Sequence, residues 1–166
     1  MSRAIYPGIF DPVTYAHLDI IRRACAMTDE LIIGVLCEPE ISPLFTCEER
    51  LHMMQEAVKD FDRVAVLSYQ KLTIDLAREL GVDFIIRDLK IGIHFEAEMK
   101  HAQTNSKMDP EIETVFLANS LELGFLASGN VKNIASYGTD VSCFVPGFVN
   151  ERLKAPICLS IPSQYY

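Results

Sequence analysis

Hydrophobic positions along the chain follow two alternating patterns, short aliphatic runs and longer segments with the period of an amphipathic helix. The aliphatic runs cover residues 3–6, 31–37, 64–67, 84–87 and 114–117. The segments of helical period lie near residues 16–28, 47–60, 71–80, 93–107, 128–137 and 147–154. Strands that alternate with helices need crossover connections. The pattern therefore predicts an α/β fold, a doubly wound, Rossmann-like sheet of five parallel strands with helices on both faces.

The chain contains no internal repeat, low-complexity tract or linker that would mark a domain boundary. We therefore predict one domain across residues 1–166, with an irregular tail at about 155–166. Hydrophobic residues make up 49% of the chain, which is enough for a core of its own. The longest apolar run, residues 31–37, is far too short to span a bilayer, so we expect a soluble, cytoplasmic protein without a membrane partner.

The net charge of −8 narrows the possible partners. A nucleic-acid backbone requires a broad basic face, and the longest cluster of Lys and Arg is Arg22–Arg23, so no nucleic-acid partner is expected. A small anion needs only a few local donors and stays compatible with an acidic chain.

Cysteine and histidine spacing predicts neither a disulfide nor a metal site. The cysteines are scattered and odd in number, without a CxxC pair, which favours reduced thiols in the cytosol; they are Cys25, Cys37, Cys47, Cys143 and Cys158. His94, Glu98 and His101 have a spacing that could hold a metal on one helix. No further ligand is in sight, so we interpret them as a solvated helical face.

The stretch "AIYPGIFDPVTYAHLDII" (4–21) is where we expect ligand chemistry, because doubly wound folds bind ligands at the carboxyl ends of their strands. Gly8 allows a tight turn, Pro12 stiffens the loop, and Thr14 suits the N-cap of the next helix. His17 then falls in the first helical turn, where free backbone amides favour a phosphate; taken alone, it could instead pack or cap. The inner face of that helix is predicted to carry Leu18, Ile21 and Cys25.

The same stretch resembles the opening signature of the bacterial phosphopantetheine adenylyltransferases, YPGTFDPxTNGHxDII, a family of the nucleotidyltransferase superfamily with its (H/T)xGH element. The likeness continues in the family's order and spacing through "PLFTCEERLHMMQEA" (43–57), "FIIRDLKIGIHFEAEM" (84–99), "MDPEIETVFL" (108–117), "FLASGNVKNIA" (125–135) and "DVSCFVP" (140–146). It covers about residues 3–155, and so many dispersed blocks make the resemblance specific.

This resemblance implies an adenylyltransferase of coenzyme A biosynthesis. The family transfers AMP from ATP to the phosphate of 4′-phosphopantetheine, releasing pyrophosphate and giving dephospho-coenzyme A, with Mg²⁺ accompanying ATP. It also implies a cytosolic enzyme, usually a hexamer, whose reaction forms no covalent intermediate. Such a protein has to orient two polyanions and stabilise charge on the transferring group.

Matching positions give the residues their roles by resemblance. The predicted catalytic residues are His17, which would stabilise the transition state, Arg87, which would meet the acceptor phosphate, and Lys90. ATP binding is predicted for Phe10, His17, Asp88, Leu89, Lys90, Glu98, Gly124, Phe125, Ala127, Ser128 and Gly129. Binding of the acceptor substrate is predicted for Ile9, Ile41, Thr73, Arg87 and Asn105.

Several of these positions depart from the family's pattern. Ile9 replaces a threonine and Ile41 replaces a lysine, both on the acceptor side, while Asp88 and Lys90 turn the family's RGLR into RDLK. Losing one preorganised donor to a developing anion costs on the order of 10²–10³ in rate, so we predict reduced activity. Two alternatives stay open, a nucleotidyltransferase with a changed acceptor and a non-catalytic nucleotide-binding relative.

Overall fold

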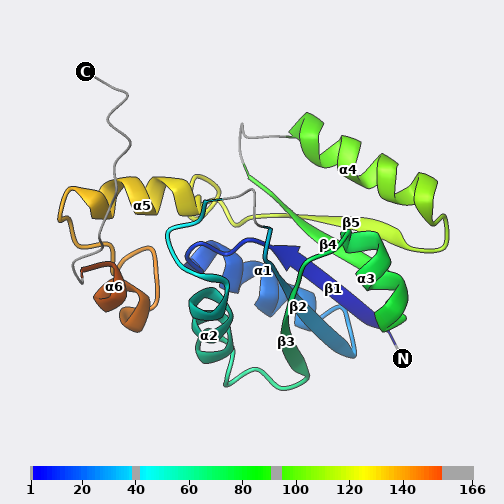
Figure 1. Cartoon of the computed structure of the whole chain (residues 1–166), viewed down its shortest axis with the longest axis horizontal. Coiled ribbons are helices and arrows are strands. Elements are labelled where there is room, and N and C mark those ends of the chain that lie inside the picture. Colours follow the sequence, from blue (N-terminus) through cyan, green and yellow to red (C-terminus); the bar gives the residue numbers. More distant parts are fainter. Residues whose placement is uncertain (1, 39–41, 91–94, 155–166) are drawn as a thin grey trace.

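The computed structural model describes residues 2–38, 42–90 and 95–154, and it confirms the predicted α/β architecture. The strands form one parallel sheet (Figure 1), and they are β1 (Arg3–Gly8), β2 (Glu30–Leu36), β3 (Val64–Tyr69), β4 (Phe84–Leu89) and β5 (Glu113–Ala118). Their order across the sheet is β3-β2-β1-β4-β5. The order reverses between β1 and β4, which is the position where doubly wound folds bind ligands.

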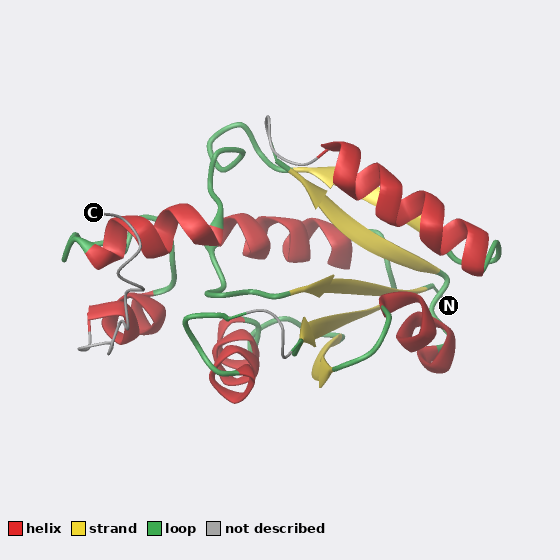
Figure 2. Ribbon diagram, turned by 45° about the horizontal axis from the view of Figure 1, so that its top comes forward, coloured by secondary structure: helices red, strands yellow, loops and turns green. Residues whose placement is uncertain are grey.

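Helices cover both faces of the sheet (Figure 2). In the described residues they are α1 (Tyr15–Cys25), α2 (Cys47–Ala57), α3 (Thr73–Leu80), α4 (Phe95–Met108), α5 (Ser128–Ser136) and α6 (Gly147–Lys154). Buried residues of α1, α2, α5 and α6 share one core with Tyr6 and Ile86. On the other face, α3 packs against Ile5 and Ile85. The predicted tail lies outside the described residues.

Local sequence explains where three of the helices begin or end. Thr14 and Thr46 cap α1 and α2, and each takes part in a capping box, with His17 and Glu49 respectively. The prediction of Thr14 as an N-cap is therefore confirmed. Gly81 ends α3 in the left-handed conformation (φ 61°), which a glycine adopts without strain.

The register of β1 and β4 decides which side chains meet at the ligand-binding edge. Ile5 pairs with Ile85, and side chains alternate between the two faces of a sheet. Tyr6 and Asp88 therefore lie on the face covered by α1. Arg87 lies on the opposite face, which α3 and α4 cover.

The buried face of α1 differs in part from the predicted one. Ile21 is buried as expected, but Leu18 and Cys25 are only partly buried, and Ile20 and Ala24 complete the stripe instead. The helix is rotated so that Leu18 and Cys25 lie at the margin of its apolar face, where they still pack against the core.

The tight turn after β1 also has a different origin from the predicted one. The positive φ of 51° belongs to Phe10, whereas Gly8 does not have a positive φ. A Cβ atom at Gly8 would lie 2.8 Å from Cζ of Phe10. Gly8 is thus required because it leaves room for the Phe10 ring.

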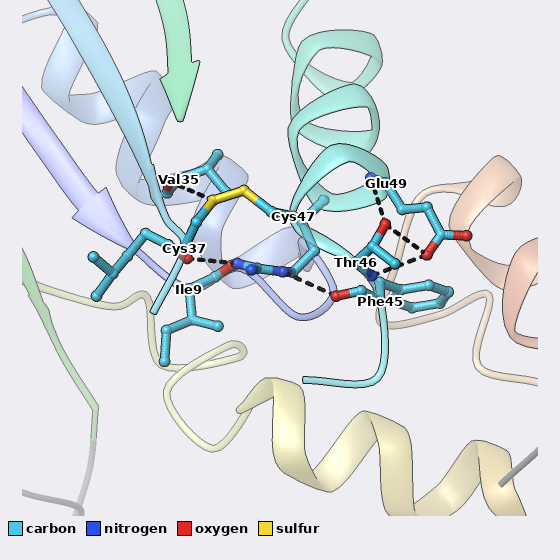
Figure 3. Close-up of a disulfide and its surroundings, with 9 residues drawn as sticks. Ile9, Val35, Cys37, Phe45, Thr46, Cys47 and Glu49 are labelled. Atoms are coloured by element: carbon cyan, nitrogen blue, oxygen red, sulfur yellow. Dashed lines mark hydrogen bonds between the residues drawn. A yellow bond between two sulfur atoms is a disulfide. The ribbon is translucent and has the colours of Figure 1, made fainter. Parts of the chain in front are cut away.

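The structure contradicts the prediction of reduced thiols at two cysteines. Cys37 and Cys47 form a disulfide, with Cα atoms 5.6 Å apart (Figure 3). The sequence argument was wrong because the start of α2 lies against the end of β2 in the fold, which the spacing of the cysteines alone does not reveal. Cys25 and Cys143 are free thiols, and Cys158 lies outside the described residues. Over the parts of the chain that the structure describes, no helix has the length and apolar character needed to cross a membrane.

Candidate active site

A cavity of about 630 Å³ opens at the carboxyl edge of the sheet, at the reversal between β1 and β4. Its walls come from the ends of β1, β2, β3 and β4, from the first turn of α1, and from α4 and α5. Segments far apart in the sequence therefore meet in one cleft, as the doubly wound fold requires. We call this cavity the switch-point cleft.

His17 enters the cleft with its protonation state fixed by its own helix. Its Nδ1 accepts a hydrogen bond from the Thr14 backbone N–H at 3.1 Å, so the ring proton lies on Nε2. Burial lowers the pKa of His17 to about 4, which keeps the ring neutral at pH 7. The ring also packs edge-to-face on Phe10, with centroids 5.1 Å apart. His17 is therefore a rigid, neutral donor.

The first amides of α1 are less available than the sequence suggested. The Tyr15 N–H donates to the Phe144 carbonyl at 2.9 Å, and the His17 N–H donates to Thr14 Oγ1 at 3.4 Å. The prediction that free amides at this terminus favour a phosphate is wrong for these two groups, because the preceding loop and the cap already use them. The side chain of His17 offers a further donor at this helix end.

The loop after β1 is held from two directions. The Asp11 carboxylate accepts from the Leu44 and Phe45 amides at 2.8 and 2.9 Å and pairs with Lys132 of α5 at 2.6 Å. From the α2 side, buried Arg50 donates to the Ile9 carbonyl at 2.6 Å and to the Leu36 carbonyl at 2.9 Å. Figure 3 shows Ile9 beside the disulfide and the start of α2. These contacts fix the loop that carries Ile9 and Phe10.

Two ion pairs occupy opposite faces of the sheet at the cleft. Arg87 forms a bidentate pair with Glu98 of α4, with N–O distances of 2.6 and 2.7 Å. On the other face, Lys90 pairs with Asp88. Burial alone would raise the pKa of the Asp88 carboxyl, but the ion pair with Lys90 holds it below its usual value. A bound polyanion would have to compete with these carboxylates for both cations.

Ser128 connects α5 to the first loop. Its hydroxyl donates to the Pro12 carbonyl at 2.8 Å, and it lines the cleft together with His17. The prediction that His17 and Ser128 face one crevice at the carboxyl ends of the strands is confirmed.

The cleft gathers most of the residues predicted from the sequence. Those that line it are Ile9, Phe10, His17, Thr73, Arg87, Asp88, Lys90, Glu98, Asn105 and Ser128. The predicted ATP-binding residues Leu89, Gly124, Phe125, Ala127 and Gly129 are described but do not line it. Leu89 lies between the lining residues Asp88 and Lys90, and Ala127 and Gly129 are the chain neighbours of the lining residue Ser128. Ile41 lies outside the described residues, as does His94.

Sequence reasoning missed several residues that form the site. Tyr6, Lys71 and Lys132 line the cleft, and Asp11 and Arg50 hold its first loop. Asp11 could have been suspected as a carboxylate in the loop after the first strand. Lys132 could have been found one helical turn after Ser128, on the same face of the predicted helix. Arg50 gave no signal, since its partners are backbone carbonyls.

Within the described residues, no group of three or more His, Cys, Asp and Glu side chains could hold a metal ion. The cleft carboxylates Asp88 and Glu98 are each paired with a cation. A dedicated metal cage is therefore not present in this part of the chain.

Comparison with known proteins agrees with this geometry. Residues 5–136 match the cytidylyltransferase-like family. A phosphopantetheine adenylyltransferase of Lachnoclostridium phytofermentans is 50% identical over 90% of this chain and 91% of its own length. One from Gloeobacter violaceus is 47% identical over 91% of this chain and 94% of its own length. A solved structure, the lipopolysaccharide core biosynthesis protein from Thermoplasma volcanium, superimposes with a TM-score of 0.55 at 22% identity, covering 72% of this chain and 98% of its own. That likeness concerns the fold alone.

Proposed function

The chain belongs to the phosphopantetheine adenylyltransferase family, and we propose that it transfers AMP from ATP to the phosphate of 4′-phosphopantetheine. The products are dephospho-coenzyme A and pyrophosphate. The observation that carries the proposal is the placement of His17 and Arg87 in one cleft at the switch point of the sheet. The names of the relatives supply the two substrates.

The chemistry needs positioned donors more than it needs an acid or a base. An oxygen of the acceptor phosphate, already ionised at pH 7, forms a bond to the α-phosphorus of ATP. The bond from that phosphorus to the bridging oxygen breaks, and pyrophosphate leaves with the electron pair. His17 Nε2–H would donate to the oxygens of the transferring group, where negative charge accumulates. A neutral ring suffices for this role, in keeping with its low pKa.

Two cations of the cleft would bind the phosphates of the two substrates, the acceptor phosphate and the triphosphate of ATP. Arg87 presents a planar fork that matches a phosphate, and this supports its assignment to the acceptor. Lys90 lies on the nucleotide face and offers a single ammonium. Both have carboxylate partners in the structure, Glu98 and Asp88, so phosphate binding would replace one anionic partner with another.

We further propose that Mg²⁺ enters with ATP. In proteins this ion keeps several waters and usually binds through substrate phosphates plus one or two carboxylates. Because Asp88 and Glu98 are each paired with a cation, the triphosphate would hold most of the coordination. Bound there, the ion would neutralise charge on the leaving pyrophosphate.

Assembly and location are also proposals by family membership. We propose a hexamer in the cytoplasm, and large apolar side chains that are exposed in the single chain support self-association; among them are Phe95, Leu121, Phe125 and Tyr137. In a reducing cytoplasm the sulfur atoms of Cys37 and Cys47 would be thiols.

Two measurements test the proposed function. Release of pyrophosphate and formation of dephospho-coenzyme A should require both ATP and 4′-phosphopantetheine. Separate calorimetric titrations should show binding of each substrate, and Arg87→Ala should weaken phosphopantetheine more than ATP. Binding of ATP alone would indicate a changed acceptor. Binding of ATP without any turnover on a phosphorylated acceptor would leave a non-catalytic nucleotide-binding protein.

A further inference from the structure

One polar atom deep in the switch-point cleft has no hydrogen-bond partner. Tyr6 is 1% exposed, and its buried hydroxyl has no hydrogen bond of good geometry to any group in the described part of the chain, although the Asp88 carboxylate lies near it. Its ring packs edge-to-face on Phe10, with centroids 5.3 Å apart, and it forms part of the cleft wall. Buried tyrosine hydroxyls usually find a partner. An orphan hydroxyl at the wall of a ligand cleft therefore indicates a partner in the ligand-bound state.

The Asp88 carboxylate is the group that can accept a hydrogen bond from the Tyr6 hydroxyl. Tyr6 and Asp88 project from neighbouring strands on the same face of the sheet, as the register of Ile5 with Ile85 requires. Burial raises the pKa of the Tyr6 hydroxyl well above its usual value, and the Asp88 carboxylate adds to this rise through its charge and as a hydrogen-bond acceptor within reach of the hydroxyl. The phenol thus keeps its proton and can donate it in a hydrogen bond to the carboxylate.

Nucleotide binding would leave the Asp88 carboxylate without its cation, and the Tyr6 hydroxyl can then donate a hydrogen bond to it. In the structure the Asp88 carboxylate is paired with Lys90, and both side chains are mostly buried. Once Lys90 turns toward a triphosphate, Asp88 is left as an unpaired carboxylate beside a polyanion. An unpaired buried charge is costly, and its repulsion would weaken the nucleotide.

We propose that Tyr6 is a positioning residue whose hydroxyl donates to Asp88 when Lys90 turns to the phosphates, holding the carboxylate against the sheet and away from the nucleotide. This inference rests on the proposed function, because it needs a polyphosphate in the cleft. It gives the orphan hydroxyl a partner and explains how a nucleotide site tolerates an acidic residue at this position.

The test is a double-mutant cycle on ATP affinity, measured by calorimetry with the wild-type protein, Tyr6→Phe, Asp88→Gly and the double variant. Tyr6→Phe should weaken ATP binding by about 10-fold when Asp88 is present, the size expected for one hydrogen bond to a charged group. In the Asp88→Gly background the same change should alter the dissociation constant by less than about 2-fold. Equal weakening in both backgrounds, or none in the wild-type background, would overturn the inference.

Two controls separate positioning from packing. Tyr69→Phe removes a hydroxyl that lines the same cleft from the other face of the sheet, but this hydroxyl already bonds Thr73 Oγ1 at 2.9 Å, so the change should show no coupling to Asp88. Tyr6→Phe should not lower the melting temperature of the ligand-free protein, since the buried hydroxyl makes no well-formed hydrogen bond there and its removal relieves an unsatisfied polar group. Asp88→Asn keeps an acceptor oxygen but removes the negative charge, so the effect of Tyr6→Phe in this background should be smaller than in the wild type.

The inference and the proposed function fail in different ways. A wild-type protein that binds ATP but forms no dephospho-coenzyme A would remove the proposed function and leave the cycle intact. If ATP does not bind, the same cycle measured with inorganic pyrophosphate decides the inference, because that ligand needs only the phosphate half of the cleft. A wild-type protein that binds neither ligand would overturn both.

Discussion

The neutral, ε-protonated ring of His17 has consequences for stability that can be measured. Its pKa of about 4 in the folded protein compares with 6.5 in an unfolded chain, so between these values the unfolded state binds more protons. Stability therefore falls as pH decreases through this window. We expect a loss of about 2 kcal/mol between pH 7 and pH 5 from this group.

Urea unfolding at both pH values checks the prediction, with His17→Asn as the comparison. The variant has no titratable group at this position, so its free energy of unfolding should change about 2 kcal/mol less than that of the wild type over the same interval. Parallel pH profiles for the two proteins would show that His17 is not held neutral by burial.

Gly8 controls the position of His17 through one intervening ring. A Cβ atom at Gly8 would lie 2.8 Å from Cζ of Phe10, and the buried Phe10 ring packs directly on His17. We expect Gly8→Ala to lower stability by about 1–3 kcal/mol through overpacking, and to lower kcat by at least about 10-fold through displacement of the histidine. Gly147→Ala is the matched control, because nothing lies within 4 Å of its Cβ position. An unchanged kcat for Gly8→Ala would contradict the link from Phe10 to His17.

At the scale of elements, the strands and helices could be predicted because their hydrophobic periods are regular. The details that could not be predicted depend on contacts between elements. One is the φ of 51° at Phe10, in the loop after β1, and another is the disulfide between Cys37 and Cys47, which joins the end of β2 to the start of α2. The role of Arg50 could not be predicted from the sequence, because its partners are the backbone carbonyls of Ile9 and Leu36, and every residue has a backbone carbonyl.

The connection between β2 and α2 yields a prediction at this scale. The disulfide closes a loop with a sequence separation of 10, and such a closure removes entropy from the unfolded chain. We expect the double change Cys37→Ser and Cys47→Ser to lower the free energy of unfolding by about 2–3 kcal/mol in oxidising buffer. Reductant should bring the wild type to the same value. Exposed Cys143 is the control, and its change to serine should have no effect. Insensitivity of the wild type to reductant would contradict a bridging role.

For the whole molecule, the cleft is divided by the sheet into two halves. Asp88 and Lys90 lie with His17 on the α1 face, whereas Arg87 and Glu98 lie on the face covered by α4. Many of the residues matched through the resemblance line this cleft, because the shared motifs lie at the strand ends, and their roles in binding stay predictions. The resemblance could not predict the pairing of each cation with a carboxylate, which depends on side-chain positions across the cleft.

Two departures from the family pattern, Ile9 and Ile41, fall on positions assigned to the acceptor by resemblance, and this leads to a prediction about turnover. Ile9 lines the cleft, and Arg50 fixes its backbone carbonyl. Its side chain lies at the position where the family has a threonine hydroxyl, and an isoleucine side chain cannot donate a hydrogen bond to a phosphate. The argument for Ile41, which lies outside the described residues, rests on the family's lysine at that position. We expect Ile9→Thr combined with Ile41→Lys to raise pyrophosphate release from ATP and 4′-phosphopantetheine by at least about 10². Most of the gain should require both changes, since the contributions of a hydroxyl and an ammonium that bind the same phosphate are not additive.

Single variants and an ATP titration provide the controls, because the affinity for ATP should stay constant in all of them. A double variant that folds and binds ATP yet keeps the wild-type rate would show that these isoleucines do not limit transfer. A wild-type rate as high as that of the double variant would show that Arg87 and His17 suffice.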